Sequence, residues 1–154
     1  MKLVIIIAIA FVLLIPIPVF AQDVYIQIDD LPEWAGYASN VMYLSTEAWK
    51  EANEGLEFYI VDSGSDFTVK WVREFGGEYV GYAYGNQFIE VGLGDSNCGN
   101  QWNPYSERYI SHIMKHEIGH IFGHEHNNNP DSIMYPVALN REYGLVEEEY
   151  RLSD

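Results

Sequence analysis

The side chains best suited to chemistry lie close together late in the chain, where all five histidines fall between His112 and His126. If this segment begins as a helix, His116 and His120 lie one turn apart on one face, so two imidazoles can bind one ion. Glu117 is then close enough to act as a base on a metal-bound water without binding the metal itself. The spacing therefore predicts a catalytic zinc site.

The third ligand has two candidates, His124 and His126. Along a helix that rises about 1.5 Å per residue, His124 would lie roughly 12 Å from His116, whereas zinc–nitrogen bonds are about 2.1 Å long. Gly123 tolerates the left-handed conformation that ends helices, so a chain turning there can bring a later side chain back to the metal. We therefore predict that His126 is the third ligand and that His124 is a bystander. Three nitrogen ligands leave the fourth tetrahedral position for water, as in catalytic zinc sites.

The pattern H-E-x-x-H-x-x-G-x-x-H, from His116 to His126, resembles the signature of the metzincin zinc peptidases. Downstream, the sequence Met134, Tyr135, Pro136 is similar to the Met-turn of the matrixins, the matrix metalloproteinase group. The resemblance implies a matrixin-like catalytic domain in which Met134 forms an apolar floor beneath the imidazoles and is not a ligand. It also implies that Tyr135 and Pro136 border the substrate and that no tyrosine acts as a fifth ligand.

Several matrixin features are missing or altered. No histidine precedes His112, so a second, structural zinc site is not expected. No calcium-loop motif is recognisable, although scattered aspartates and glycines leave weak calcium binding open. Val137 and Ala138 follow the Met-turn, so the tyrosine that forms part of the matrixin specificity wall is absent and the pocket preference does not transfer. We expect one catalytic zinc ion as the cofactor.

Peptidases of this type bind substrate as an added strand along a sheet edge. By its place in the matrixin pattern, the segment 77–84 is the candidate for this edge, with Tyr82 and Ala83 as substrate-binding residues. The alternative is an ordinary core strand with tyrosines on its solvent-facing side. Both interpretations remain open from the sequence.

Strand and helix patterns predict an α+β domain with a twisted, mostly parallel sheet of about five strands, a long packing helix and an active-site helix. The active-site helix is expected to begin after Ser106 as N-cap, with His112 near the cleft but outside the metal site. A short acidic helix over 141–154 would complete a small C-terminal helical subdomain. Strands are expected at 24–28, 56–61, 67–73, 79–84 and 88–92. The long helix starts near Pro32 and ends at Asn53, and its inward-facing residues are Trp34, Ala38, Val41, Ala48 and Ala52.

Residues 1–21 begin with a short basic end and then run without charge to Ala21. This predicts a secretory signal peptide, removed after Ala21. The alternative is a retained membrane anchor, because the uncharged run approaches the length that spans a bilayer; Pro16 and Pro18 interrupt a helix and favour cleavage. Either way we expect the catalytic domain, residues 22–154, to lie outside the cytoplasm.

The chain carries 23 acidic and 8 basic residues, a net charge of −15. This charge argues against nucleic acid and anionic membranes as partners. We expect a protein or peptide substrate, no stable partner and a monomer. Cys98, the only cysteine, lies in an expected loop at 94–100 and cannot form a disulfide within the chain. It is either an ordinary free thiol, which we favour, or a cap on the metal.

The function predicted from these features is a secreted zinc endopeptidase with Glu117 as general base. Two other classes stay open. One is a metal-binding interaction module without activity, and the other is a zinc exopeptidase or amidase.

Overall fold

The computed structural model describes residues 22–136, so the predicted signal peptide or anchor and the predicted C-terminal helix lie outside the described residues. Within 22–136, no helix is long and apolar enough to cross a membrane.

Five strands form one sheet in the order β2-β1-β3-β5-β4. β1 pairs in parallel with β2 and β3, and β3 pairs in parallel with β5, whereas β4 runs antiparallel to β5. The predicted α+β fold with a mostly parallel sheet is confirmed. The strand predicted at 79–84 is shorter than expected and begins only at Gly81. The strands are β1 (Gln22–Ile28), β2 (Leu56–Ile60), β3 (Phe67–Val72), β4 (Gly81–Tyr84) and β5 (Phe88–Gly92).

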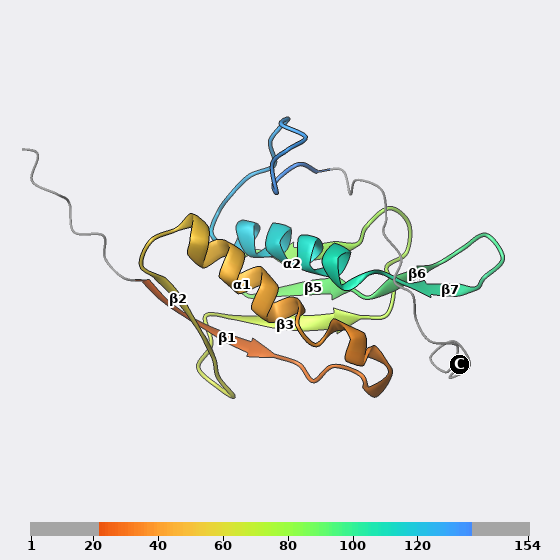
Figure 1. Cartoon of the computed structure of the whole chain (residues 1–154), viewed down its shortest axis with the longest axis horizontal. Helices are drawn as coiled ribbons and strands as arrows, with labels where there is room; N and C mark the ends of the chain where they lie inside the picture. The colour runs from red at the N-terminus through yellow and green to blue at the C-terminus, as the bar shows by residue number, and fades with distance from the viewer. Residues whose placement is uncertain (1–21, 137–154) are drawn as a thin grey trace, which may run out of the picture.

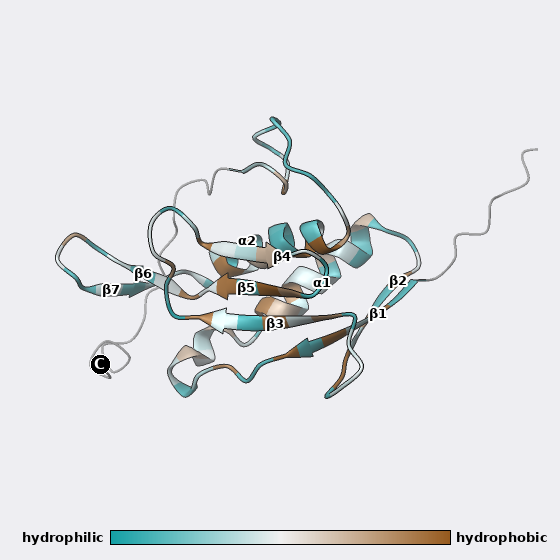
Figure 2. Cartoon of the chain, turned by 180° about the vertical axis from the view of Figure 1, so that it is seen from behind, coloured by the Kyte–Doolittle hydropathy of each residue, from teal (hydrophilic) through white to brown (hydrophobic). Residues whose placement is uncertain are grey.

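The helices α1 (Val41–Ala52) and α2 (Glu107–Ile121) lie on one face of this sheet (Figure 1), and the view from behind shows the strands in front of them (Figure 2). In β3, Phe67 and Val69 are almost fully buried, whereas the intervening Thr68 is only half-buried. This alternation places the apolar side chains against the helices, and it produces a core on one side of the sheet.

The long helix predicted from Pro32 to Asn53 is wrong as a single element. It consists of a 3-10 helix (Glu33–Ala38), in which Ala35 has non-helical angles (φ −100, ψ 20), followed by the separate helix α1. Gly36 and Asn40 are poor helix formers, so the break falls where propensity is weakest. The new helix has its own phase, so its buried face differs in part from the predicted one. Val41 is buried as predicted, but Ala48 is half-buried and Ala52 exposed, while Met42, Ser45 and Thr46 are buried.

Hydrogen bonds set the close approach of α1 to α2. The hydroxyl of Ser45 lies 3.2 Å from that of Ser111 on α2, so two small side chains meet at the crossing. One turn further, the indole N–H of Trp49 donates to the carbonyl oxygen of Lys115, at 3.1 Å. Because α2 carries the histidine motif, these contacts fix the helix that positions the candidate site.

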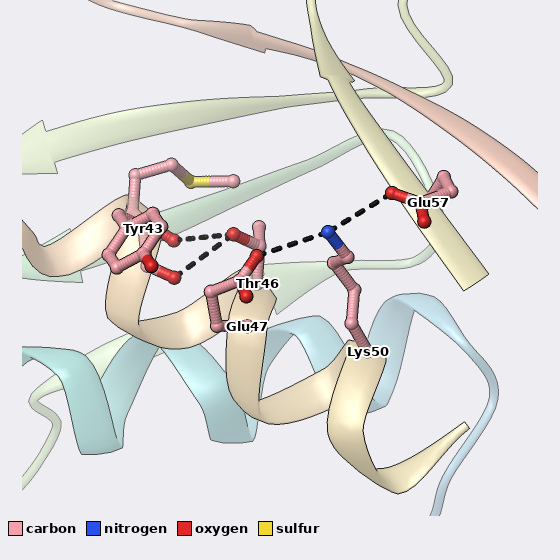
Figure 3. Close-up of polar contacts among 6 residues, drawn as sticks. Tyr43, Thr46, Glu47, Lys50 and Glu57 are labelled. Carbon is pink, nitrogen blue, oxygen red and sulfur yellow. Dashed lines mark hydrogen bonds and ion pairs between the residues drawn. The ribbon is translucent and has the colours of Figure 1, made fainter. Parts of the chain in front are cut away.

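A surface ion-pair cluster connects α1 to the edge strand β2 (Figure 3). The ammonium of Lys50 lies 3.1 Å from the carboxylate of Glu47 and 3.1 Å from that of Glu57. Exposed pairs of this kind contribute little to stability, so the buried apolar face, and not this cluster, stabilises the layer arrangement.

The predicted loop at 94–100 is partly a β-hairpin, made of β6 (Gly94–Ser96) and β7 (Trp102–Pro104). The hairpin depends on tertiary packing, because the Trp102 ring packs edge-on against Trp34 and beneath the guanidinium of Arg73. Cys98 is exposed in the connection between the two strands.

Candidate metal centre and active-site cleft

Helix α2 begins where the sequence predicts. Ser106 is its N-cap, with extended backbone angles (φ −66, ψ 151), and its hydroxyl oxygen accepts a hydrogen bond from the backbone N–H of Tyr109 at 3.1 Å. Ile110, Ile113 and Ile118 are buried against the core. With that face of the helix fixed, the polar side chains of the motif are directed to the other side.

The chain turns at Gly123, which has a φ of +81. The backbone N–H of Gly123 donates to the carbonyl of His120, and that of His124 donates to the carbonyl of Gly119, both at 2.9 Å. These bonds satisfy carbonyl groups at the helix end. The turn reverses the chain so that residues after Gly123 return toward the helix.

The reversal brings three imidazoles together. Nε2 of His126 lies 3.1 Å from Nε2 of His116 and 3.2 Å from Nε2 of His120. Tetrahedral zinc with bonds of about 2.1 Å places its ligand atoms about 3.4 Å apart. The spacing of the three nitrogens therefore fits a single zinc ion.

The other ring nitrogens set the tautomers that such a site needs. Nδ1–H of His116 donates to the carbonyl of Ile133 at 2.6 Å, and Nδ1–H of His120 donates to the carbonyl of His124 at 2.9 Å. With the proton on Nδ1, each Nε2 presents a lone pair to the common point. His124 contributes only its backbone, since its ring stacks on Trp49 at a centroid distance of 5.5 Å.

Met134 packs against α2 at Gly119. It is 5% exposed, and a Cβ on Gly119 would collide with its sulfur, so the glycine leaves room for the thioether against α2. Asn127 ties the Met-turn to the segment after His126: its backbone N–H donates to the Met134 carbonyl at 3.1 Å, and its side-chain amide donates to the Ser132 hydroxyl at 2.7 Å. The sequence did not single out this tie, and an Asn followed by a Ser five residues on is too weak a signal to find it.

Glu117 lies beside the cluster and is 6% exposed. Burial raises the pKa of this carboxyl to about 8. The backbone of β4 comes very close to it, because a Cβ on Gly81 would lie 2.6 Å from Oε1 of Glu117. Gly81 is thus a further residue of the site that sequence reasoning missed.

A cleft of about 440 Å³ opens over Glu117 between β4 and α2. β4 is at the edge of the sheet, so one side of its backbone faces away from the other strands. All four residues expected to border the substrate line the cleft, and so does His112. The lining residues are 78–83, Gly85, Tyr109, His112, Ile113, His116, Glu117, His120, His126, Tyr135 and Pro136.

A family model described as matrixin matches residues 27–150. The chain belongs to the matrixin family. It is therefore a zinc metallopeptidase, whose substrates are proteins or peptides. No curated protein sequence matches it.

Two solved structures illustrate the similarity of the fold. Archaemetzincin from Methanopyrus kandleri has a TM-score of 0.52 and 14% sequence identity, over 82% of this chain and 87% of that one. Myroilysin has a TM-score of 0.47 and 18% identity, over 70% of this chain, which spans 50% of the length of myroilysin.

A zinc-dependent matrixin needs a set of side chains that can bind the metal. Among residues 22–136, the three converging histidines are the one group of His, Cys, Asp and Glu side chains that could hold a metal ion. Cys98 is not part of this group and does not line the cleft.

Proposed function

We propose that this matrixin is a secreted zinc endopeptidase in which His116, His120 and His126 hold the metal and Glu117 is the general base. The observation that carries the proposal is the convergence of three Nε2 atoms beside a buried carboxylate at the bottom of an open cleft. Secretion is supported by the uncharged stretch that ends at Ala21.

Zinc bound by these histidines supplies Lewis acidity, which makes water a nucleophile near neutral pH and polarises a peptide carbonyl. Glu117 takes the proton that the attacking water loses and then delivers it to the leaving amine. The buried position of Glu117 suits this role, since a carboxyl with a raised pKa holds a proton more readily than an exposed one. Gly81, which has no side chain, lets the opposite wall of the cleft approach the carboxylate closely.

The edge strand gives the substrate a template. An extended peptide can add to β4 through main-chain hydrogen bonds, which hold it with little regard to its sequence. Residues 78–83 and Gly85 all line the cleft, so its wall follows most of β4 and the segment before it, and a chain can extend on both sides of Glu117. This geometry favours cleavage of internal bonds over trimming of chain ends.

Mass-spectrometric mapping of products from denatured proteins tests the proposal. Internal cuts that disappear with a chelator and return with zinc are expected. Trimming restricted to chain ends would indicate an exopeptidase, and zinc binding without any turnover would indicate a module without activity; either result would overturn the proposal. N-terminal sequencing of the exported protein, with a start at Gln22, tests the cleavage after Ala21.

A further inference from the structure

Two basic residues lie on α2 beside the end of the cleft that precedes His116, although neither lines the cleft itself. Arg108, His112 and Lys115 follow one another at spacings of four and three residues, so they share one side of the helix. The whole chain has only 8 basic residues against 23 acidic ones. Two of these few cations therefore flank the one histidine of the cleft that lies outside the metal cluster.

His112 is half-buried and lines the cleft beside Tyr109 and Ile113. Burial lowers its pKa below the ordinary value, and the charges of Lys115 and then Arg108 lower it further. The positive charges of both residues are therefore felt where a substrate side chain would contact this imidazole. Glu78 is the charged residue that lines the cleft from the β4 side, and it is exposed.

We propose that this end of the cleft selects an acidic substrate side chain, Asp or Glu, next to the scissile bond, with His112 as the specificity-determining residue that contacts it. The inference rests on the proposed endopeptidase function. A ring N–H of His112 donates to the substrate carboxylate, and such charge-assisted bonds are stronger than neutral ones. Arg108 and Lys115 lie outside the cleft lining, but their charges act on His112 and so also favour an anion beside this imidazole.

A substrate with leucine in place of the acidic residue would lack the hydrogen bond to His112. It would cover a half-buried imidazole with hydrocarbon, and a polar group that is desolvated without a partner costs free energy. A lysine would additionally meet two like charges. The expected order of preference is therefore acidic, then aliphatic, then basic.

The test uses synthetic peptides built on an internal cut site mapped in a denatured protein and differing only in one residue that flanks the scissile bond. The wild-type enzyme should cleave the Glu peptide with a kcat/KM on the order of tenfold above that of the Leu peptide. His112→Leu should bring this ratio to one or below, and His112→Gln, which keeps an N–H donor, should retain part of it. Arg108→Gln combined with Lys115→Gln should lower the ratio, and Glu78→Gln should raise it.

The inference is overturned if wild type cleaves the Leu peptide at least as well as the Glu peptide, or if His112→Leu leaves the ratio unchanged while circular dichroism shows a folded protein. In both cases internal cleavage persists, so the proposed endopeptidase function stands. Absence of any internal cleavage by the wild-type enzyme would overturn that function and this inference together.

Discussion

Gly119 and Met134 share a space that would not hold one more carbon atom: a Cβ on the glycine would collide with the methionine sulfur. The contact joins the last turn of α2 to the Met-turn, which also carries the Ile133 carbonyl that fixes the ring of His116. We therefore expect the metal cluster to depend on the packing of Met134 against α2 as well as on the three imidazoles.

Gly119→Val should displace Met134, since overpacking a buried contact costs about 1–3 kcal/mol. We expect a lower free energy of unfolding and weaker zinc binding, measured by urea denaturation and by competition with a zinc indicator. Gly36→Ala is the control, because nothing lies within 4 Å of a Cβ there. Equal effects of the two substitutions would contradict the packing argument.

The two histidines after Gly123 should behave differently. His126→Ala removes one of three converging nitrogens, so bound zinc and activity should both fall sharply. His124→Ala removes a ring that stacks on Trp49 and leaves intact the backbone carbonyl that accepts from His120, so zinc content should be nearly unchanged. Zinc analysis of the purified variants decides the point, and loss of zinc in His124→Ala alone would reverse the assignment.

Gly81→Val should reduce turnover without removing zinc. The added side chain would push against Oε1 of Glu117, and misplacing a catalytic group by about 1 Å can cost about 100-fold in rate. Gly76→Val serves as the control because the space around Gly76 is open. The measurement is kcat together with zinc content, and an unchanged kcat in Gly81→Val would show that the strand does not position the carboxylate.

Metal-free protein should show the cost of burying Glu117. Its pKa is about 8 in the folded chain against an ordinary value of 4.5, so between these pH values the folded state binds more protons than the unfolded state. The free energy of unfolding therefore falls as pH rises through this window. Glu117→Gln removes the ionisation, so the metal-free variant should exceed wild type by about 2–4 kcal/mol at pH 8 and by little at pH 4.5. Urea denaturation with a chelator measures this, and a difference that does not grow with pH would contradict it.

The sequence was informative where local geometry decides the outcome. The helical spacing of His116 and His120, the left-handed turn at Gly123 and the cap at Ser106 each depend on a few neighbouring residues, and each lies where it was predicted. Residues that depend on contacts between distant segments were missed. Gly81 meets Glu117 only because β4 packs on α2. The hydrogen bond from Asn127 to Ser132 is local, but an Asn and a Ser five residues apart form too weak a pattern to predict it.

The prediction of one continuous helix through the break before α1 also failed. Extending one helical phase from Trp34 to Ala52 ignored the cost of Gly36 and Asn40, and the error shifted the predicted buried face. The β6–β7 hairpin was missed because Trp102 is held by Trp34 and Arg73, which lie far away in the sequence.

We propose that Glu117 performs the proton transfers of peptide hydrolysis at a zinc site formed by three histidines. Zinc content and internal cleavage should therefore be measured in parallel for Glu117→Gln, with the exposed Glu125→Gln as the matched control. We expect one zinc per chain in both variants, wild-type cleavage in Glu125→Gln, and a loss of cleavage by at least about 100-fold in Glu117→Gln. Cleavage near the wild-type rate by zinc-loaded Glu117→Gln would contradict it.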